Sequence, residues 1–456
     1  VNNMKRHILI TSLLAASLFT AGCVSTPTPP MSLSEELNYS ASLQQKYTAD
    51  EEWWKQYKNT ELNRLVETAL ANNPDYLTAA LNINKELYNL NLASSDLFPT
   101  LSAGLGASSQ RQIDTHDNYS SNFSGELGLN YEVDLYGKIR DLQTAQEFEY
   151  KATIMDKDAA RLSLVNSVVD LYFNLEYLQN SIDITEENIG TYRNLKKIAE
   201  AKYKNGKTDN VEYLQAEQSL RSEQNRLLDL QTQFREMEKS LKNILNITPG
   251  EDLKIQYADI MQQKNLPVNL DVPLSVLANR PDLLANQYRL EKFFKTLEAE
   301  TKNWYPDITL KGALNSSSNK ARTTFDFPYV LGSISVDLPF LDWNRVKNNV
   351  LISETDYQIA LIDFRDNLNQ ALNEVAYYNF AYQKSADILE NTQKNYQNSA
   401  AITQYYKERY DSGKSEFKDY LEAVYNENSL RKDLIQQKYQ TIKYENYIYK
   451  AMAGKY

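Results

Sequence analysis

The feature that most constrains the fold is an internal repeat with a fixed offset of 207 residues. Four separated motifs of the first half recur in the second half at this offset. They are Asn73-Pro74-Asp75 with Arg280-Pro281-Asp282, Phe98-Pro99 with Tyr305-Pro306, Tyr136-Gly137-Lys138 with Trp343-Asn344-Arg345, and Tyr203, Gly206, Lys207 and Leu214 with Tyr410, Gly413, Lys414 and Leu421. We therefore predict a tandem duplication, with repeat 1 over 53–250, a linker over 251–279 and repeat 2 over 280–456.

Long helices dominate each predicted copy, because turn-forming residues are rare. The chain has 13 Gly and 12 Pro among 456 residues, well below average use. From Lys138 to Lys204 it has no Pro and one Gly, Gly190, which predicts one helix of roughly 67 residues and about 100 Å. Such helices are too polar to be buried all round, which favours a coiled-coil-like tube. The predicted helices cover about 74–97, 138–204 and 208–246 in repeat 1 and about 281–304, 342–411 and 415–452 in repeat 2.

The N-terminus reads as a leader. Lys5-Arg6 precedes an apolar segment of about 14 residues, which suits a signal peptide over 1–22 and is too short to span a bilayer. The stretch Thr20-Ala21-Gly22-Cys23 resembles a bacterial lipobox, with Thr20 where Leu is usual. We therefore expect lipidation of Cys23, followed by an extended tether over 23–52. The alternative is an ordinary cleavage site beside an uninvolved cysteine.

Each copy also contains two stretches in which apolar and polar residues alternate, as in a strand with two different faces. The predicted strands cover about 100–113, 121–135, 307–318 and 329–340. They fit a soluble sheet with one buried face or a transmembrane barrel with an aqueous interior. The continuous polar face, the leader and the lack of helices to cover the apolar face favour the membrane. Four strands cannot close a barrel, so the chain must oligomerise, as a dimer with about eight strands or a trimer with about twelve.

Composition argues against several classes of function. The formal net charge of -11 disfavours nucleic-acid binding,. One Cys and two His leave no thiolate metal site and little for His-based catalysis,. His116 is expected in an outer loop between two strands, and no phosphate loop, zinc spacing or nucleophile motif occurs. We expect no enzyme activity, no cofactor and no metal site.

Several motifs occur in the order typical of outer membrane factors. They are Trp53-Trp54, Leu62-Asn63-Arg64-Leu65-Val66, Ala69-Leu70-Ala71-Asn72-Asn73-Pro74-Asp75, the stretch Tyr131-Glu132-Val133-Asp134-Leu135-Tyr136-Gly137-Lys138, and Asn279-Arg280-Pro281-Asp282. Over about residues 50–452 the chain resembles the TolC family, and within it the lipoprotein efflux branch of the OprM and NodT type.

This resemblance implies a mostly α-helical chain with a membrane β part. Three chains would form a 12-stranded outer-membrane β-barrel, four strands from each, continuous with a long periplasmic α-helical barrel. It implies a lipid-anchored passive channel of the Gram-negative outer membrane that exports small molecules such as drugs. Its partners would be a periplasmic adaptor and an inner-membrane pump of the RND type. The alternatives are the outer-membrane component of type I protein secretion and a structural trimeric stalk.

The turns between the long helices form one candidate site. Asn205-Gly206-Lys207 and Ser412-Gly413-Lys414 each contain a Gly that allows the positive φ of a tight helix hairpin. The residues themselves predict a pair of turns. By resemblance, the same exposed tips contact the helical hairpins of the adaptor.

Acidic residues after the second tip form the other candidate site. Asp419 and Glu422 are three residues apart and share one helix face, where solvated charge is the ordinary interpretation. By resemblance they belong to the periplasmic aperture, together with Tyr410 and, in the first copy, Glu212 and Gln215. Three chains would then place six carboxylates around one constriction, which favours cations.

The resemblance also implies Tyr and Arg links that hold the aperture shut. Tyr410 matches the Tyr position, whereas Ser415 stands where TolC itself has Arg. Lys414, beside it, is the candidate substitute for that missing cation.

Overall fold

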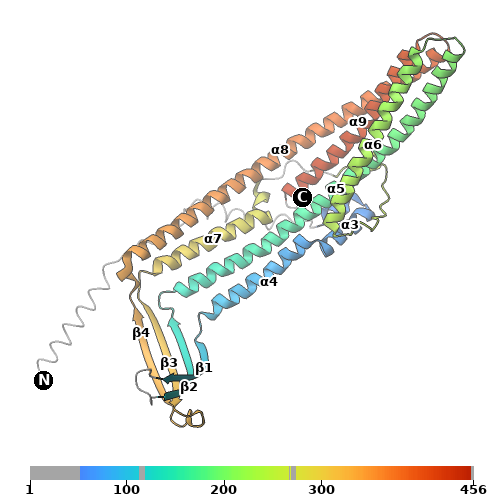
Figure 1. Cartoon of the computed structure of the whole chain (residues 1–456). Coiled ribbons are helices and arrows are strands. Elements are labelled where there is room, and N and C mark those ends of the chain that lie inside the picture. Colours follow the sequence, from blue (N-terminus) through green and yellow to red (C-terminus); the bar gives the residue numbers. More distant parts are fainter. Residues whose placement is uncertain (1–51, 112–118, 267, 269–273, 453–456) are drawn as a thin grey trace, which may run out of the picture. The chain divides into compact units, whose positions relative to one another are not determined.

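The computed structural model describes residues 52–111, 119–266, 268 and 274–452. The predicted signal peptide, the expected lipidation site Cys23, nearly all of the expected tether and His116 lie outside these ranges. The described residues are mostly helical, with one small antiparallel sheet (Figure 1). They fall into two compact units, one with residues 89–147 and 291–359 and one with residues 52–88, 148–290 and 360–452. Among the described helices, none is both long and apolar enough to cross a membrane.

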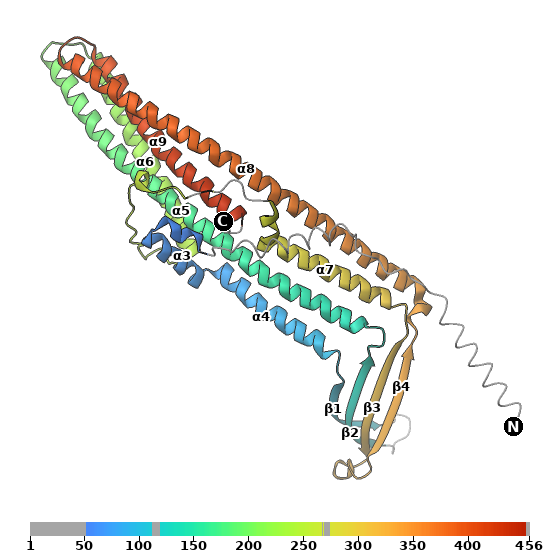
Figure 2. The ribbon, with the colours of Figure 1, turned by 180° about the vertical axis from the view of Figure 1, so that it is seen from behind.

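The first unit contains the sheet. Its strands are β1 (Thr100–Arg111), β2 (Tyr119–Val133), β3 (Asp307–Ser318) and β4 (Tyr329–Asp337), paired antiparallel in the order β1-β2-β3-β4 (Figure 2). Two strands end earlier than expected. β4 stops at Asp337 because Pro339 opens a 3-10 turn, η5 (Pro339–Asp342). β2 stops at Val133 because the carboxylate of Asp134 accepts the amide of Ile139 at 3.0 Å and so caps the next helix,.

The register gives the sheet one apolar and one polar face. Directly paired residues point to the same side of an antiparallel sheet. Leu101 pairs with Leu129, Leu127 with Leu314, and Leu310 with Ile334. The opposite face carries, among others, Ser102, Asn122, Ser124, Glu126, Asn130, Thr309, Lys311, Ser333 and Ser335. The alternation expected from the sequence is therefore aligned across all four strands.

Along the chain, each pair of strands is preceded by one helix and followed by another. They are α4 (Pro74–Ser95), α5 (Lys138–Lys204), α7 (Pro281–Lys302) and α8 (Trp343–Asp411). The bounds of α5 are those that the sequence indicates, whereas α4 ends at Ser95 rather than near 97. The side chains of Ser94 and Ser95 bond back to carbonyls of the last turn, and Pro99 follows, which cannot continue a helix.

The second unit is completed by α3 (Thr60–Asn72), α6 (Val211–Leu245), α9 (Phe417–Ala451) and the 3-10 turns η1 (Trp53–Tyr57), η2 (Ile260–Gln262) and η3 (Leu274–Asn279). Its largest hydrophobic core gathers η1 and α3 against α5 and α9. Trp53 stacks on Tyr449 at 5.0 Å between ring centroids, and Tyr57 packs edge-on against Phe173 at 4.9 Å. Helix α3 was not among the expected helices.

Both halves have the order helix, two strands, long helix, helix. Equivalent residues also close equivalent helix ends. The Asn73 amide donates to the carbonyl of Ile244 at the end of α6, at 2.9 Å. The guanidinium of Arg280 donates to the carbonyl of Ala451 at the end of α9, at 3.3 Å. Each pair of partners is separated by the same 171 residues, so Asn73 and Arg280 hold equivalent helix ends in the two halves of the chain.

Candidate functional site at the helix hairpins

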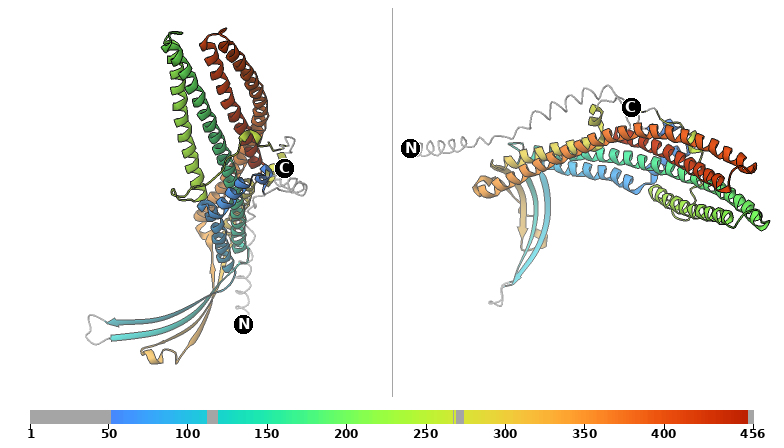
Figure 3. Two further views of the ribbon diagram at one scale, coloured as in Figure 1. Left: turned by 90° about the vertical axis from the view of Figure 1, so that its right-hand side faces the viewer. Right: turned by 90° about the horizontal axis from the view of Figure 1, so that it is seen from above.

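Two helix hairpins, α5 with α6 and α8 with α9, turn at the same end of the second unit (Figures 1 and 3). Each turn closes by the same pair of backbone bonds. The Lys207 amide donates to the Lys202 carbonyl at 2.9 Å and the Gly206 amide to that of Tyr203, also at 2.9 Å. In the second turn the Lys414 amide bonds the Arg409 carbonyl and the Gly413 amide the Tyr410 carbonyl. This is a Schellman motif, for which left-handed Gly is preferred.

The glycines have the conformation that the turn needs. Gly206 has φ of 66° and Gly413 has φ of 69°. The loops after them are longer than expected, since α6 begins at Val211 instead of about 208 and α9 at Phe417 instead of about 415. Asp209 delays α6, because its carboxylate accepts the amide of Val211 at 2.9 Å. Asn205, Lys207, Ser412 and Lys414 are exposed at these tips.

One lysine joins the two hairpins. The Lys202 ammonium donates to the hydroxyl of Tyr410 at 2.6 Å and lies 4.0 Å from the centroid of that ring. The other sides of the Tyr410 ring pack on Phe417 and Tyr420, at 5.6 and 5.7 Å between centroids. Tyr410 is therefore held between a cation of the first hairpin and aromatic rings of α9.

Within the described chain, the cation bonded to the Tyr410 hydroxyl is Lys202. Lys414, the expected substitute, contributes its backbone carbonyl, which accepts from Arg409 at 3.0 Å. The hydroxyl of Ser415 is buried and has no hydrogen-bond partner within the described chain. Sequence reasoning missed Lys202. The only signal for it is the repeat itself, which pairs Lys202 with Arg409, the residue before Tyr410.

A cavity of about 350 Å³ lies between the hairpins and is lined by acidic and polar side chains. The lining includes Lys202, Asp209, Glu212, Tyr410, Ser415 and Glu416. One oxygen of the Glu212 carboxylate is buried and has no partner in the described chain. Burial raises the pKa of Glu212, opposed by Lys202 and supported by Asp209 and Glu416,. The lining thus sets three carboxylates against Lys202 and Lys418, and the Glu212 carboxylate lacks one hydrogen bond.

The structure separates the acidic residues that the sequence grouped. Glu212 and Tyr410 line the cavity together with Gln215. Asp419 is half-buried and Glu422 is exposed on α9, and neither lines this cavity. Within the described ranges neither of these two carboxylates makes an ion pair or a hydrogen bond. They are available to other chains.

A buried ion pair fastens the hairpins further along. The Lys432 ammonium of α9 contacts the Glu223 carboxylate of α6 at 2.9 Å, and the side chains are only 13% and 9% exposed. The amide of Asn188 in α5 donates to the same carboxylate at 3.0 Å. Burial lowers the pKa of Lys432, opposed by Glu223. Removing one partner of such a pair leaves the other charge buried and unpaired, which is strongly destabilising.

Hydrophobic packing surrounds these polar links. The cluster comprises Ile189, Tyr192, Leu195 and Ala199 of α5, Ala216 and Leu220 of α6, and Phe417, Leu421 and Val424 of α9. No group of three or more His, Cys, Asp or Glu side chains in the described part of the chain is arranged to hold a metal ion. The geometry is that of two packed hairpins with charged tips.

The described chain thus combines long helices, a two-faced antiparallel sheet and two packed helix hairpins. The family described as outer membrane efflux protein matches this chain twice, over residues 65–246 and 272–454. The chain therefore belongs to the outer membrane efflux protein family, whose members are efflux channels and not enzymes.

Relatives and solved structures agree with this membership. "Toxin and drug export protein A" of Aggregatibacter actinomycetemcomitans is 36% identical over 451 residues, which cover 99% of this chain and 98% of that protein. "Pyoverdine export outer membrane protein OpmQ" of Pseudomonas putida is 26% identical over 385 residues, 82% of this chain and 81% of that one. The CmeC outer membrane channel of Campylobacter jejuni has a TM-score of 0.82 at 25% identity and covers 89% of this chain and 88% of its own. VceC of Vibrio cholerae, at 20% identity and a TM-score of 0.81, shares the fold over 89% of this chain and 99% of its own.

Proposed function

We propose that this protein is the outer-membrane channel of a tripartite efflux system, a passive exit duct for small molecules such as drugs. The observation that carries the proposal is the sheet, whose register sorts apolar residues to one face and polar residues to the other. Sheet faces of this kind suit lipid on one side and water on the other. Membership of the efflux family supports the same assignment.

A homotrimer would complete the duct. The sheet is open, with β1 and β4 at its edges. Unpaired edges are a liability that closure into a barrel removes. Three copies would supply twelve strands, with the polar faces inward, and their long helices would form the periplasmic tunnel. The tandem duplication, supported by the double family match, would give each chain two similar shares of the wall.

The helix tips would meet the partners. The proposed contacts to a periplasmic adaptor are Asn205, Gly206, Lys207, Ser412, Gly413 and Lys414. The adaptor would connect the channel to an inner-membrane pump of the RND type, in keeping with the resemblance to the lipoprotein efflux branch. Asp419 and Glu422 from three chains would form the acidic ring of the aperture, near Tyr410 and Glu212. Acylation of Cys23 would anchor the N-terminus in the outer membrane.

A second function, export of proteins through a type I secretion system, is favoured by one specific observation. The relative at 36% identity carries both "toxin" and "drug" in its name. The two functions are separable in a strain that lacks the gene. Restored drug resistance without a change in secreted proteins supports the efflux role, and the reverse result supports secretion. A structural stalk would restore neither.

Single-channel conductance in planar bilayers tests the channel. We expect a small cation-selective conductance from the wild-type protein. The Asp419→Ala/Glu422→Ala variant should conduct more or lose selectivity, because it removes six carboxylates from the proposed ring. Folded protein without conductance in either form argues against a channel. Conductance that the substitutions leave unchanged places the gate elsewhere.

A further inference from the structure

The loop between β3 and β4, residues 319–328, folds back onto the apolar face of the sheet. Ser316 and Ser318 are polar exceptions on this face, in line with Leu314. Both serines bind the loop. The Ser316 hydroxyl donates to the carbonyl of Thr324, and the Ser318 hydroxyl lies 2.6 Å from that of Thr323. The two serines therefore fix the loop over the apolar face, which also carries Ser109, Arg111 and Ser121 near this end of the sheet.

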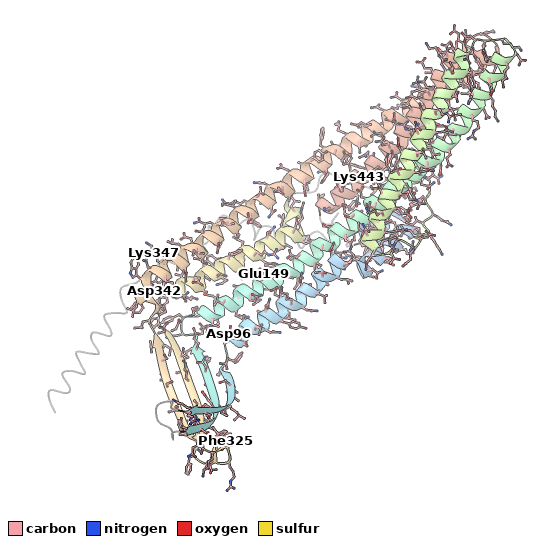
Figure 4. The ribbon with its side chains drawn as sticks, viewed as in Figure 1. Asp96, Glu149, Phe325, Asp342, Lys347 and Lys443 are labelled. Carbon is pink, nitrogen blue, oxygen red and sulfur yellow. The ribbon has the colours of Figure 1, made fainter. Side chains whose placement is uncertain are left out.

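Phe325 of this loop rests directly on a glycine of the sheet. A Cβ at Gly125 would lie 2.5 Å from the Phe325 ring, so only Gly permits this approach,. The ring nevertheless remains 65% exposed, at the end of the sheet shown in Figure 4. It borders a cavity of about 490 Å³ whose lining includes Ala103, Leu105, Leu127, Leu314, Phe325 and Pro328. The result is an apolar groove on the sheet with an aromatic edge.

Unpaired cations accompany the groove. Lys320 and Arg322 are exposed in the same loop and form no ion pair within the described residues. Arg111 is exposed at the end of β1, at a position that shares the apolar face with Leu101 and Leu105. Asp326 is the one acidic residue of the loop sequence. Among the described residues at this end of the strands, Arg111, Lys320 and Arg322 therefore outnumber Asp326; the sequence between β1 and β2 adds Asp114 and Asp117.

We propose that this groove and its cations bind a phosphorylated lipid. One acyl chain lies along the apolar groove beside Phe325, and the phosphate contacts Lys320 and Arg322. Charge complementarity selects this occupant, because a neutral lipid leaves both cations unpaired and a free phosphate leaves the groove empty. The inference rests on the proposed function, in which the apolar face meets the lipid of the outer membrane.

Native mass spectrometry of the full-length, detergent-extracted protein tests the site. The probes are lipid A, which carries phosphate, and the same lipid after dephosphorylation. We expect the Lys320→Gln/Arg322→Gln variant to bind lipid A at least tenfold more weakly and to bind the dephosphorylated lipid like the wild type. Phe325→Ala should weaken binding of both lipids. The matched control is Lys347→Gln/Lys407→Gln, which removes two exposed lysines on α8; Lys347 lies at the opposite end of the sheet in Figure 4.

Three results would overturn the proposal. These are equal binding of lipid A by wild type and Lys320→Gln/Arg322→Gln, equal affinity of the wild type for both lipids, and full displacement of the lipid by inorganic phosphate. Conductance of the same samples reports on the channel separately. A charge-dependent lipid preference in protein that does not conduct would support the lipid site and reject the channel. Conductance without that preference would support the channel and reject the lipid site.

Discussion

Lys202 is the residue on which the contact between the two hairpin tips depends most directly. Its ammonium reaches both the hydroxyl and the ring of Tyr410. A hydrogen bond from a charged donor is worth roughly 1.5–3 kcal/mol when shielded, and less for a half-buried lysine in contact with solvent. The contact is therefore strong enough to favour the arrangement in which the two tips touch. It is also weak enough for a binding partner to break.

We expect Lys202→Met to loosen the tips by about 1 kcal/mol per chain, and Tyr410→Phe to have a smaller effect because the ring contact remains. In the proposed channel both changes raise the conductance measured in planar bilayers. Lys204→Met is the matched control, because Lys204 is exposed and pairs with Glu200 of its own helix. Equal conductance of all three variants would exclude Lys202 from the closure.

Glu445 makes the stability of the second unit depend on pH. It is fully buried on α9, where one of its oxygens accepts the amide of Leu266 at 3.2 Å and the hydroxyl of Tyr57 at 3.4 Å. The other oxygen has no partner in the described chain. Burial raises the pKa of Glu445 from 4.5 to about 8, although Lys438 and these hydrogen bonds oppose the shift,.

Because the pKa of Glu445 is higher in the folded than in the unfolded protein, the folded state holds the proton more firmly. Its contribution to stability is fully present below pH 4.5 and is lost as the pH rises to about 8, by up to about 1.4 kcal/mol per pH unit. We expect Glu445→Gln to flatten the free energy of unfolding across this range in denaturant titrations. Glu67→Gln, at an exposed site on α3, should leave the slope unchanged. An unaltered slope in Glu445→Gln would contradict the assignment.

At the scale of the elements, the hairpin turns rest on backbone conformation more than on side chains. A Cβ at Gly413 would have open space around it, so the positive φ is the only strain that Ala would meet. We expect Gly413→Ala to lower the unfolding free energy by about 1 kcal/mol. Gly190 also has open space but lies inside α5, where Ala is favoured over Gly. Gly190→Ala should therefore raise the unfolding free energy by roughly 0.5–1 kcal/mol. Thermal unfolding of both variants checks the opposite signs, and shifts of the same sign would refute the argument.

A helix or strand can be predicted from the sequence when neighbouring residues alone determine where it begins and ends. Helix α5 has its expected bounds because Lys138–Lys204 contains no Pro and its ends are set by neighbouring residues. Helix α3 was missed although Leu62, Leu65, Val66 and Ala69 have helical spacing and are all buried. The helical signal is present there, but it precedes the repeat landmarks, which begin at Asn73.

In the candidate site, the turns could be predicted from the sequence, whereas the contacts between the two hairpins could not. The turns at Gly206 and Gly413 are local and were predicted. The contact between Lys202 and Tyr410 joins residues 208 positions apart, and no local pattern states which side chains two hairpins bring together. The same holds for Glu223 with Lys432, which are separated by 209 residues. Spatial neighbours of this kind required the structure.

At the scale of the whole molecule, the open sheet predicts assembly. Native mass spectrometry of the detergent-extracted protein should give a mass of three chains, because the proposed barrel needs the edges β1 and β4 of three copies to pair. Heating the sample before measurement is the control and should yield single chains. A predominant monomer or dimer before heating would contradict the twelve-stranded arrangement.

The hairpin tips are closed by backbone amides and carbonyls and by one Gly in each turn. The side chains of Asn205 and Ser412 add bonds to the carbonyls of Ala201 and Glu408, both at 2.7 Å. Lys207 and Lys414, by contrast, are exposed and display side chains that the turns hardly constrain. In the proposed docking to an adaptor, substitutions of these two lysines can alter recognition while the turns keep their shape, so partner specificity can change with little loss of stability. In the proposed tandem duplication the two tips can also diverge independently, so that one chain offers two different surfaces.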